Sequence, residues 1–181
     1  AYGSSPAVRI GDSGGPAITV GNVGTMTNYT YGLVNDSSIG AISVYDAVSA
    51  TGVRIENANL TGGLRNAGSI LAGSFDQQGT GVSIGLGAVV AEINNAGSIT
   101  GLTDSDLAPF DAYGVRIEAG ANAPILRNSG AIIGRLQGET ADAIAIADLS
   151  DTLHLIENTG SITAYHTATD DALDTDDADN D

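Results

Sequence analysis

Apolar and polar residues alternate in short runs that recur at a nearly regular interval along the chain. Apolar–polar–apolar triplets occupy residues 8–10, 53–55, 82–84 and 115–117, and an apolar triplet at 144–146 falls at the matching place. A period of two is that of a half-buried strand, and no window keeps the 3.6-residue period of a helix. The pattern therefore predicts an all-β chain built from many short strands.

A second motif follows each triplet and reads aliphatic, any residue, Asn, any residue, Gly, small, aliphatic. Its Asn comes at a nearly constant distance after the triplet. The Asn and Gly positions are Asn22 and Gly24, Asn66 and Gly68, Asn95 and Gly97, Asn128 and Gly130, and Asn158 and Gly160. These copies are nearly evenly spaced from the second onward, and the wider gap between the first two leaves room for a shorter, degenerate coil around residues 33–39.

A repeat of about 30 residues with three short β segments buries its apolar face only by stacking on its neighbours. We therefore predict a parallel β-solenoid of about six coils, with equivalent strands about 4.8 Å apart along the axis. Val, Ile and Leu at matching positions would stack as ladders in a narrow aliphatic core. Residues 1–164 form the predicted solenoid, and residues 165–181 form an acidic segment that is either a tail or the start of further coils.

The repeated Asn and Gly are predicted to form a corner between two sheets. Asn tolerates the left-handed backbone region, and a Gly two residues later accepts a positive φ. Stacked Asn side chains can also hydrogen-bond to one another along the axis. We interpret this set as a structural ladder and not as a ligand site, because packing alone demands identical residues at every corner.

The repeats, with Gly-Val-Arg-Ile leading to Leu-Arg-Asn-Ala-Gly-Ser-Ile-Leu-Ala, resemble the passenger regions of bacterial autotransporters and related large repeat-containing surface proteins. The resemblance extends from about residue 7 to about residue 164. It implies a right-handed parallel β-helix exported to the outer surface of a Gram-negative cell. No C-terminal stretch resembles the family's translocator barrel. Since the family's roles include adhesion, aggregation and surface display, the fold does not select one of them.

Composition narrows the classes of partner. The chain of 181 residues has six Arg and no Lys against 22 acidic residues, a formal net charge of −16. Nothing would neutralise phosphates, so we exclude non-specific nucleic-acid binding and recruitment to anionic membranes. The absence of Cys removes disulfides and thiolate chemistry. No window reaches the roughly 20 apolar residues of a spanning helix, so we expect no direct membrane insertion.

The hexapeptide at residues 11–16, Gly-Asp-Ser-Gly-Gly-Pro, matches the nucleophile motif of trypsin-like serine proteases. In that family the general-base His lies far upstream of the Ser, whereas only twelve residues precede Ser13 and none is His. The hexapeptide also falls in a turn between the first two strands of its repeat. We therefore predict no catalytic Ser, and we interpret His154 and His166 as surface residues.

Arginines recur on the predicted outward faces, as Arg54 and Arg116 in the triplets and as Arg65 and Arg127 just before the corner Asn. Some parallel β-helix enzymes that cleave acidic polysaccharides use Arg and Asp on such faces. A carbohydrate-active β-helix enzyme, a lyase or a hydrolase, is therefore the alternative function. The net charge of −16 would repel a polyanionic substrate, and regular repetition favours exposed ion pairs.

Two acidic segments are candidate binding sites. The longest predicted connection, residues 101–113, contains Asp104, Asp106, Phe110 and Asp111, which would contact a sugar, a calcium ion or a partner protein unless Phe110 packs onto the solenoid side. Seven of the last twelve residues are Asp. Alternating oxygen ligands suit calcium, although the Gly and distal Glu of an EF-hand loop are missing, and a disordered solvating tail is the other interpretation. The candidate calcium ligands are Asp174, Asp176, Asp177, Asp179 and Asp181.

The sequence therefore predicts a non-enzymatic surface β-solenoid that acts as an adhesin, a spacer or a subunit of an extracellular assembly, with no catalytic residues. Unpaired strand edges at the two ends of the stack require a protein partner or further coils. Glycans are the other expected ligands.

Overall fold

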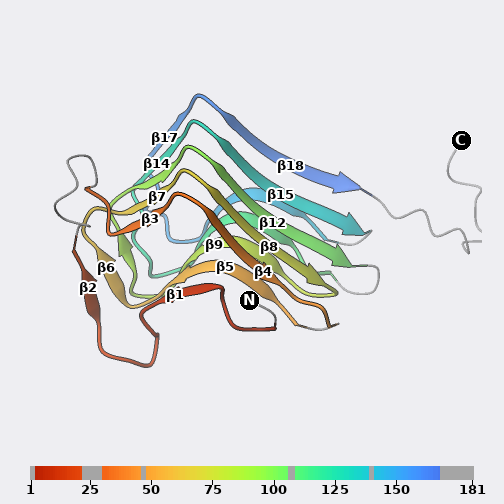
Figure 1. Cartoon of the computed structure of the whole chain (residues 1–181), viewed down its shortest axis with the longest axis horizontal. Coiled ribbons are helices and arrows are strands. Elements are labelled where there is room, and N and C mark those ends of the chain that lie inside the picture. Colours follow the sequence, from red (N-terminus) through yellow and green to blue (C-terminus); the bar gives the residue numbers. More distant parts are fainter. Residues whose placement is uncertain (1–2, 22–29, 46–47, 106–108, 139–140, 168–181) are drawn as a thin grey trace, which may run out of the picture.

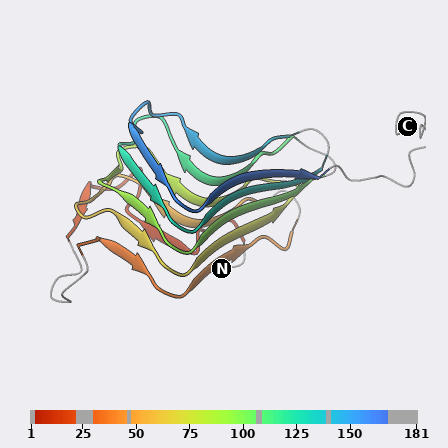
Figure 2. The same cartoon turned by 90° about the horizontal axis from the view of Figure 1, so that it is seen from above.

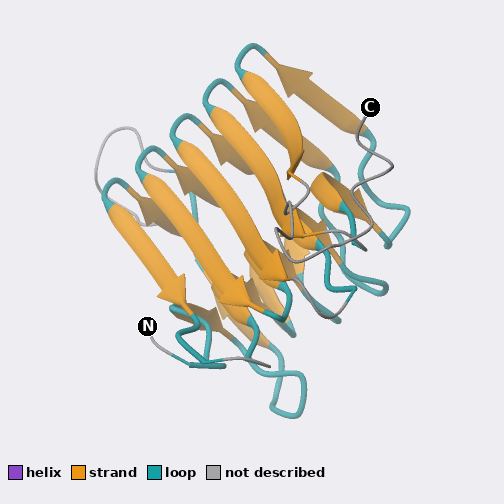
Figure 3. Cartoon of the chain, turned by 90° about the vertical axis from the view of Figure 1, so that its right-hand side faces the viewer, coloured by secondary structure: helices purple, strands orange, loops and turns teal. Residues whose placement is uncertain are grey.

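The computed structural model describes residues 3–21, 30–45, 48–105, 109–138 and 141–167 (Figure 1). Regular structure in these ranges consists of β-strands alone, and every strand pairing between them is parallel. Equivalent strands of successive repeats lie side by side (Figure 3). The predicted all-β solenoid is thereby confirmed.

Four sheets, numbered I to IV in chain order, form the sides of the stack. Sheet I contains the triplets and consists of β1 (Val8–Ile10), β5 (Ala50–Ile55), β9 (Gly79–Ile84), β13 (Ala112–Ile117) and β16 (Ala143–Asp148). Sheet II is short and consists of β2 (Ile18–Val20), β6 (Ala58–Leu60) and β10 (Val89–Val90).

Sheets III and IV lie on the two sides of the Asn corner. Sheet III consists of β3 (Leu33–Asn35), β7 (Leu64–Asn66), β11 (Ile93–Asn95), β14 (Ile125–Asn128) and β17 (Leu155–Asn158). Sheet IV consists of β4 (Ser38–Ile42), β8 (Ser69–Phe75), β12 (Ser98–Ser105), β15 (Ala131–Gly138) and β18 (Ser161–Thr167). The corner recurs at the same place in each rung (Figures 1 and 2).

The stack has five rungs and makes about four turns, fewer than the predicted six coils. The first Asn motif accounts for the difference, because Val20 pairs with Leu60 in sheet II and not with Leu64 in sheet III. Residues 33–39, predicted as a separate degenerate coil, instead supply β3 and the corner of the first rung. There Asn35 pairs with Asn66.

The core is the narrow aliphatic column that the sequence predicts. Fully buried ladder residues include Ile55, Ile84 and Ile117 from sheet I, which pair in register. Sheets III and IV contribute further buried aliphatic rows, such as Leu64 and Ile70 of the second rung. Burial of each such side chain stabilises the fold by about 1.5–3 kcal/mol, so stacking and not aromatic bulk supports this chain.

The core tapers where sheets IV and I converge. A Cβ added to Gly52 would lie 2.6 Å from the side chain of Ile70, and the same substitution at Gly81 would bring a Cβ 2.8 Å from Ile99. Small residues therefore occupy this edge because the two sheets approach too closely for side chains. The Gly before the triplet motif has a packing role.

Candidate functional site

A chain of buried Asn side chains runs the length of the Asn corner. The Nδ2 atom of each Asn donates to Oδ1 of the next, at 2.7 Å for three links and 2.8 Å for the last. Three ladder residues are almost completely buried, Asn66 and Asn95 at 0 % exposure and Asn128 at 2 %. The order is Asn35, Asn66, Asn95, Asn128 and Asn158. Since each middle Asn is hydrogen-bonded on both sides, the ladder is a structural element.

The corner glycines have a different role from the predicted one. Gly68, Gly97, Gly130 and Gly160 do not have positive φ angles. A Cβ at each of them would instead lie 1.8–2.0 Å from a backbone oxygen of the preceding rung. Gly is required because the backbone of one rung presses against the next. Asn22 and Gly24 lie outside the described residues.

Sheet III carries a polar cluster on its outer face. The Tyr31 hydroxyl donates to Glu92 Oε1 at 2.9 Å. Asn94 Nδ2 donates to the Tyr31 hydroxyl oxygen and to Glu92 Oε1, each at 2.9 Å. Arg127 Nε donates to Glu92 Oε2 at 3.1 Å. A shallow cavity of about 200 Å³ lies beside Asn94 and Arg127 and extends to Glu157.

These contacts shift the pKa of two groups in the cluster. Burial raises the pKa of Tyr31, and the hydrogen bond to the Glu92 carboxylate raises it further. Burial also raises the pKa of Glu92, but hydrogen bonds from Asn94, Tyr31 and Arg127 outweigh it and hold that pKa below its ordinary value. The cluster therefore keeps an ionised carboxylate whose oxygens are already hydrogen-bonded.

Carboxylates accompany most of the arginines. Glu56 is buried at 3 % exposure between Arg54, 2.6 Å away, and Arg9, 3.1 Å away. The sequence pattern predicted exposed ion pairs on the outward faces, but the Glu56 carboxylate is buried. Arg116 pairs with Glu118 at 3.3 Å. The predicted Arg rows are held in ion pairs within the protein.

The protease-like hexapeptide forms a local turn. The Asp12 side chain accepts a hydrogen bond from the Gly14 amide at 3.0 Å and pairs with Arg9 at 3.0 Å. Ser13 is exposed in the connection between β1 and β2, in the first rung. His154 precedes β17 in the fifth rung, and His166 Nε2 lies 2.7 Å from the Gly138 carbonyl oxygen. Neither His is placed beside the Ser.

The predicted loop of residues 101–113 is shorter than expected. Asp104 belongs to β12, where it pairs with Phe75 and Gln137, because the strand after the corner extends to Ser105. Phe110 is half-buried. Asp111 accepts a hydrogen bond from the Tyr113 hydroxyl at 2.6 Å.

This last contact also affects titration. Burial, then the Asp111 hydrogen bond and charge, raise the pKa of Tyr113 to about 12.

Asp106 lies outside the described residues, as do all five predicted calcium ligands of the acidic segment. Within the described ranges no group of three or more His, Asp or Glu side chains is placed to hold a metal ion. Calcium binding by the acidic segment stays a prediction.

The outer face of sheet IV carries exposed apolar side chains among polar ones, a feature that the sequence motifs did not predict. Ile42, Leu71, Phe75 and Tyr165 are 40 %, 39 %, 45 % and 53 % exposed on this face. The signal was present in the sequence, because every second residue after the Ser-Ile pair points outward and many of these residues are large and apolar. We call this surface the sheet IV face.

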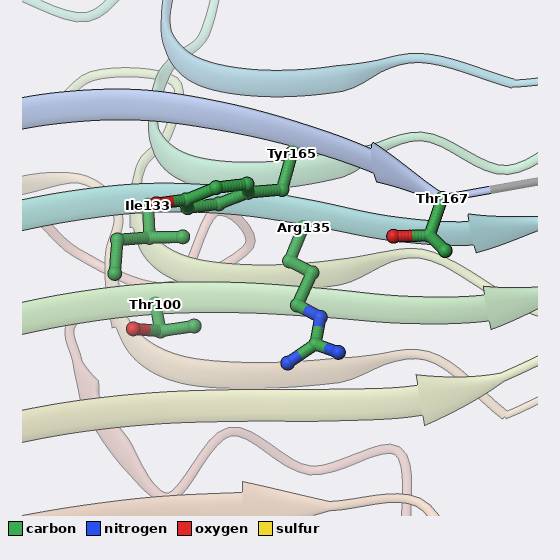
Figure 4. A pocket seen from close by; sticks show the side chains of 5 residues that line it. All are labelled: Thr100, Ile133, Arg135, Tyr165 and Thr167. Atoms are coloured by element: carbon green, nitrogen blue, oxygen red, sulfur yellow. The ribbon is translucent and has the colours of Figure 1, made fainter.

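A cavity of about 350 Å³ lies on the sheet IV face over its last three strands, β12, β15 and β18. It is lined by Thr100, Ile133, Arg135, Tyr165 and Thr167 (Figure 4). The Tyr165 ring lies over Ile133, and the Arg135 side chain extends across β12 (Figure 4). The other five arginines each have a carboxylate within ion-pair distance, but no described carboxylate lies that close to Arg135.

The fifth rung is an open end of the described stack. Ile156 is 49 % exposed, whereas Leu126, its partner in the preceding rung, is fully buried. At the matching place in sheet I, Asp148 replaces the ladder Ile, and its carboxylate accepts hydrogen bonds from Ser150 and from the Leu153 amide. This end is thus capped on the side of sheet I and open on the side of sheet III.

These features define the class of the molecule, a parallel β-solenoid with an internal Asn ladder and exposed apolar side chains on one outer face. Comparison with protein-family models, curated proteins and solved structures gives no match. The described part of the chain contains no helix able to cross a membrane.

Proposed function

We propose that this chain is a non-enzymatic β-solenoid segment of an extracellular assembly, which presents an adhesive surface or acts as a spacer. One observation carries the proposal, the four exposed apolar side chains of the sheet IV face, Ile42, Leu71, Phe75 and Tyr165. Contiguous apolar patches on soluble proteins often mark interaction sites, because their exposure to water is unfavourable.

The stack supports an adhesive role because it holds this face rigidly. Strand pairing fixes every outward side chain of sheet IV in register with its neighbours, and the ladder fixes the adjoining corner. A preorganised surface loses less entropy on binding than a flexible one. The resemblance to autotransporter passengers supports the outer surface of a Gram-negative cell as the location.

Retention and turnover separate this proposal from an enzymatic one. The whole chain is applied to a glycan array and incubated with a polysaccharide panel, with product formation followed by mass spectrometry. We expect retention without turnover. Turnover of any polysaccharide would contradict the non-enzymatic role. Ser13-dependent labelling by a fluorophosphonate, checked against Ser13→Ala, would contradict it in the same way.

A carbohydrate-active enzyme is the second candidate, and the polar cluster of sheet III favours it. Glu92 is an ionised carboxylate beside the Tyr31 hydroxyl and the Arg127 guanidinium. If this cluster is catalytic, turnover will disappear in Glu92→Gln and persist in Asp12→Asn, which changes a carboxylate in the first rung. Turnover that survives Glu92→Gln would rule out this site.

We also propose that the open end is covered by a protein partner or by further coils. The exposure of Ile156 supports this, because Leu64, Ile93 and Leu126 are buried in the same row of the inner rungs. Intact-mass measurement and terminal sequencing of the natural protein test for further coils, and light scattering tests for a partner copy. A natural protein that ends at Asp181 and stays monomeric alone and in extracts would contradict the proposal.

A further inference from the structure

We propose that the cavity around Arg135 on the sheet IV face binds a terminal acidic sugar, one pyranose ring that carries a single carboxylate and an N-acetyl group, as in sialic acids. This inference rests on the proposed adhesive function and names its ligand.

Arg135 is the cation of this cavity. It is exposed, and no carboxylate among the described residues lies within ion-pair distance of it. A guanidinium offers a planar pair of donors that matches a carboxylate. An exposed guanidinium that is paired with none of the described carboxylates can bind a carboxylate of a ligand.

The walls of the cavity fit the remainder of such a sugar. Tyr165 is 53 % exposed and presents a rigid ring next to Ile133, which together form an apolar wall for the acetyl methyl group and the C–H face of the ring (Figure 4). The hydroxyls of Thr100 and Thr167 line the same cavity and can hydrogen-bond to sugar hydroxyls. Cation, apolar wall and hydroxyls thus meet in one place.

The volume of the cavity and the net charge of the chain favour a single acidic sugar over an acidic polysaccharide as the ligand. The cavity of about 350 Å³ lies near the lower limit of small-molecule sites, about 300–1,000 Å³. A net charge of −16 would repel a polyanion strongly, whereas a single carboxylate at the end of a neutral glycan is repelled least and can pair with Arg135. The expected ligand is therefore the terminal sugar of a glycan.

Calorimetric titration of the whole chain with the α-methyl glycoside of N-acetylneuraminic acid tests the proposal. We expect binding by the unaltered chain and affinity roughly ten- to a hundredfold lower in Arg135→Gln, since a charge-assisted pair is lost. Tyr165→Ala should also weaken binding. Arg65→Gln, the same substitution on sheet III, is the matched control and should bind as the unaltered chain does. Circular dichroism checks that each variant is folded.

A second probe isolates the carboxylate. The same glycoside with its carboxylate converted to a carboxamide should bind as weakly as the acid binds to Arg135→Gln. Equal affinity for the two probes, unchanged affinity in Arg135→Gln, or no binding at millimolar concentration would overturn the proposal. So would dimerisation abolished by Tyr165→Ala, since a second copy would then cover the face. The three binding outcomes leave the adhesive role intact, whereas cleavage of the glycoside would contradict that role.

Discussion

Replacing Asn95 with Ala tests whether the buried ladder stabilises the stack. The substitution removes the donor to Asn128 Oδ1, at 2.7 Å, and the acceptor of Asn66 Nδ2, also at 2.7 Å. It also removes hydrogen bonds to the Gly97 and Ala131 carbonyl oxygens, at 3.2 and 3.0 Å. The Asn128 oxygen is then left buried without the donor it had, which costs about 1–3 kcal/mol.

Asn66 Nδ2 keeps its two backbone acceptors, so its loss is smaller. With the space left by the amide group, the free energy of unfolding should fall by about 2–4 kcal/mol. For a chain of this size that is a decrease in Tm of roughly 4–16 °C. Thermal and urea unfolding followed by circular dichroism measure the change.

The ladder supplies its own control in Asn158→Ala. Asn158 is exposed and receives one ladder bond, from Asn128 at 2.8 Å, so its loss should cost only about 0.5–1 kcal/mol. Equal destabilisation by Asn95→Ala and Asn158→Ala would refute the reasoning, because the ladder's effect would then not depend on burial.

Three further predictions concern packing and titration. Gly97→Ala should lower the unfolding midpoint strongly, because the new Cβ would lie 1.9 Å from the Gly68 carbonyl oxygen, while Gly40→Ala, with nothing within 4 Å, should leave it nearly unchanged. Ultraviolet titration should show one phenol that ionises near pH 12 and is missing in Tyr113→Phe. Because folding raises the pKa of Tyr113 from 10.0, its contribution to the stability of the fold is full below about pH 10 and is lost between about pH 10 and pH 12. Burial raises the pKa of Asp148, but hydrogen bonds to its carboxylate outweigh this and lower it, so its stabilisation is present above its ordinary pKa of 3.8 and is lost as the pH falls below that value. Acid unfolding, compared with Asp148→Asn, should show less loss of stability at low pH in the variant; parallel acid curves would contradict this.

The strands of sheets I, III and IV were predictable because stacking demands the same residue type at the same place in each rung. The first ladder position was not predictable by similarity alone. At that corner Ser37 replaces the Gly of the other copies, so residues 33–39 looked degenerate. The structure explains this exception, because the corner glycines avoid the backbone of the preceding rung and the first described rung has none before it.

The candidate site was harder to predict than the fold. Arg135 differs from the other arginines in having no described carboxylate within ion-pair distance, and its neighbours come from β12 and β18, one repeat before it and one repeat after it in the sequence. Likewise, Asp104 was predicted as a loop residue because nothing in the motif marks how far the strand after the corner extends. Register in three dimensions, and not local pattern, decides both cases.

The Asn ladder also gives the stack an electrical direction. All four amide-to-amide bonds point the same way, from the first rung toward the fifth. Aligned amide dipoles add and polarise one another, as they do in a helix. The fifth rung therefore carries the positive pole of this column at the NH₂ group of Asn158, and the first rung carries the negative pole at the Asn35 oxygen. A surface that docks on the open end is favoured if it places a hydrogen-bond acceptor opposite the NH₂ group of Asn158. Two such columns would therefore stack with the first rung of one on the fifth rung of the other.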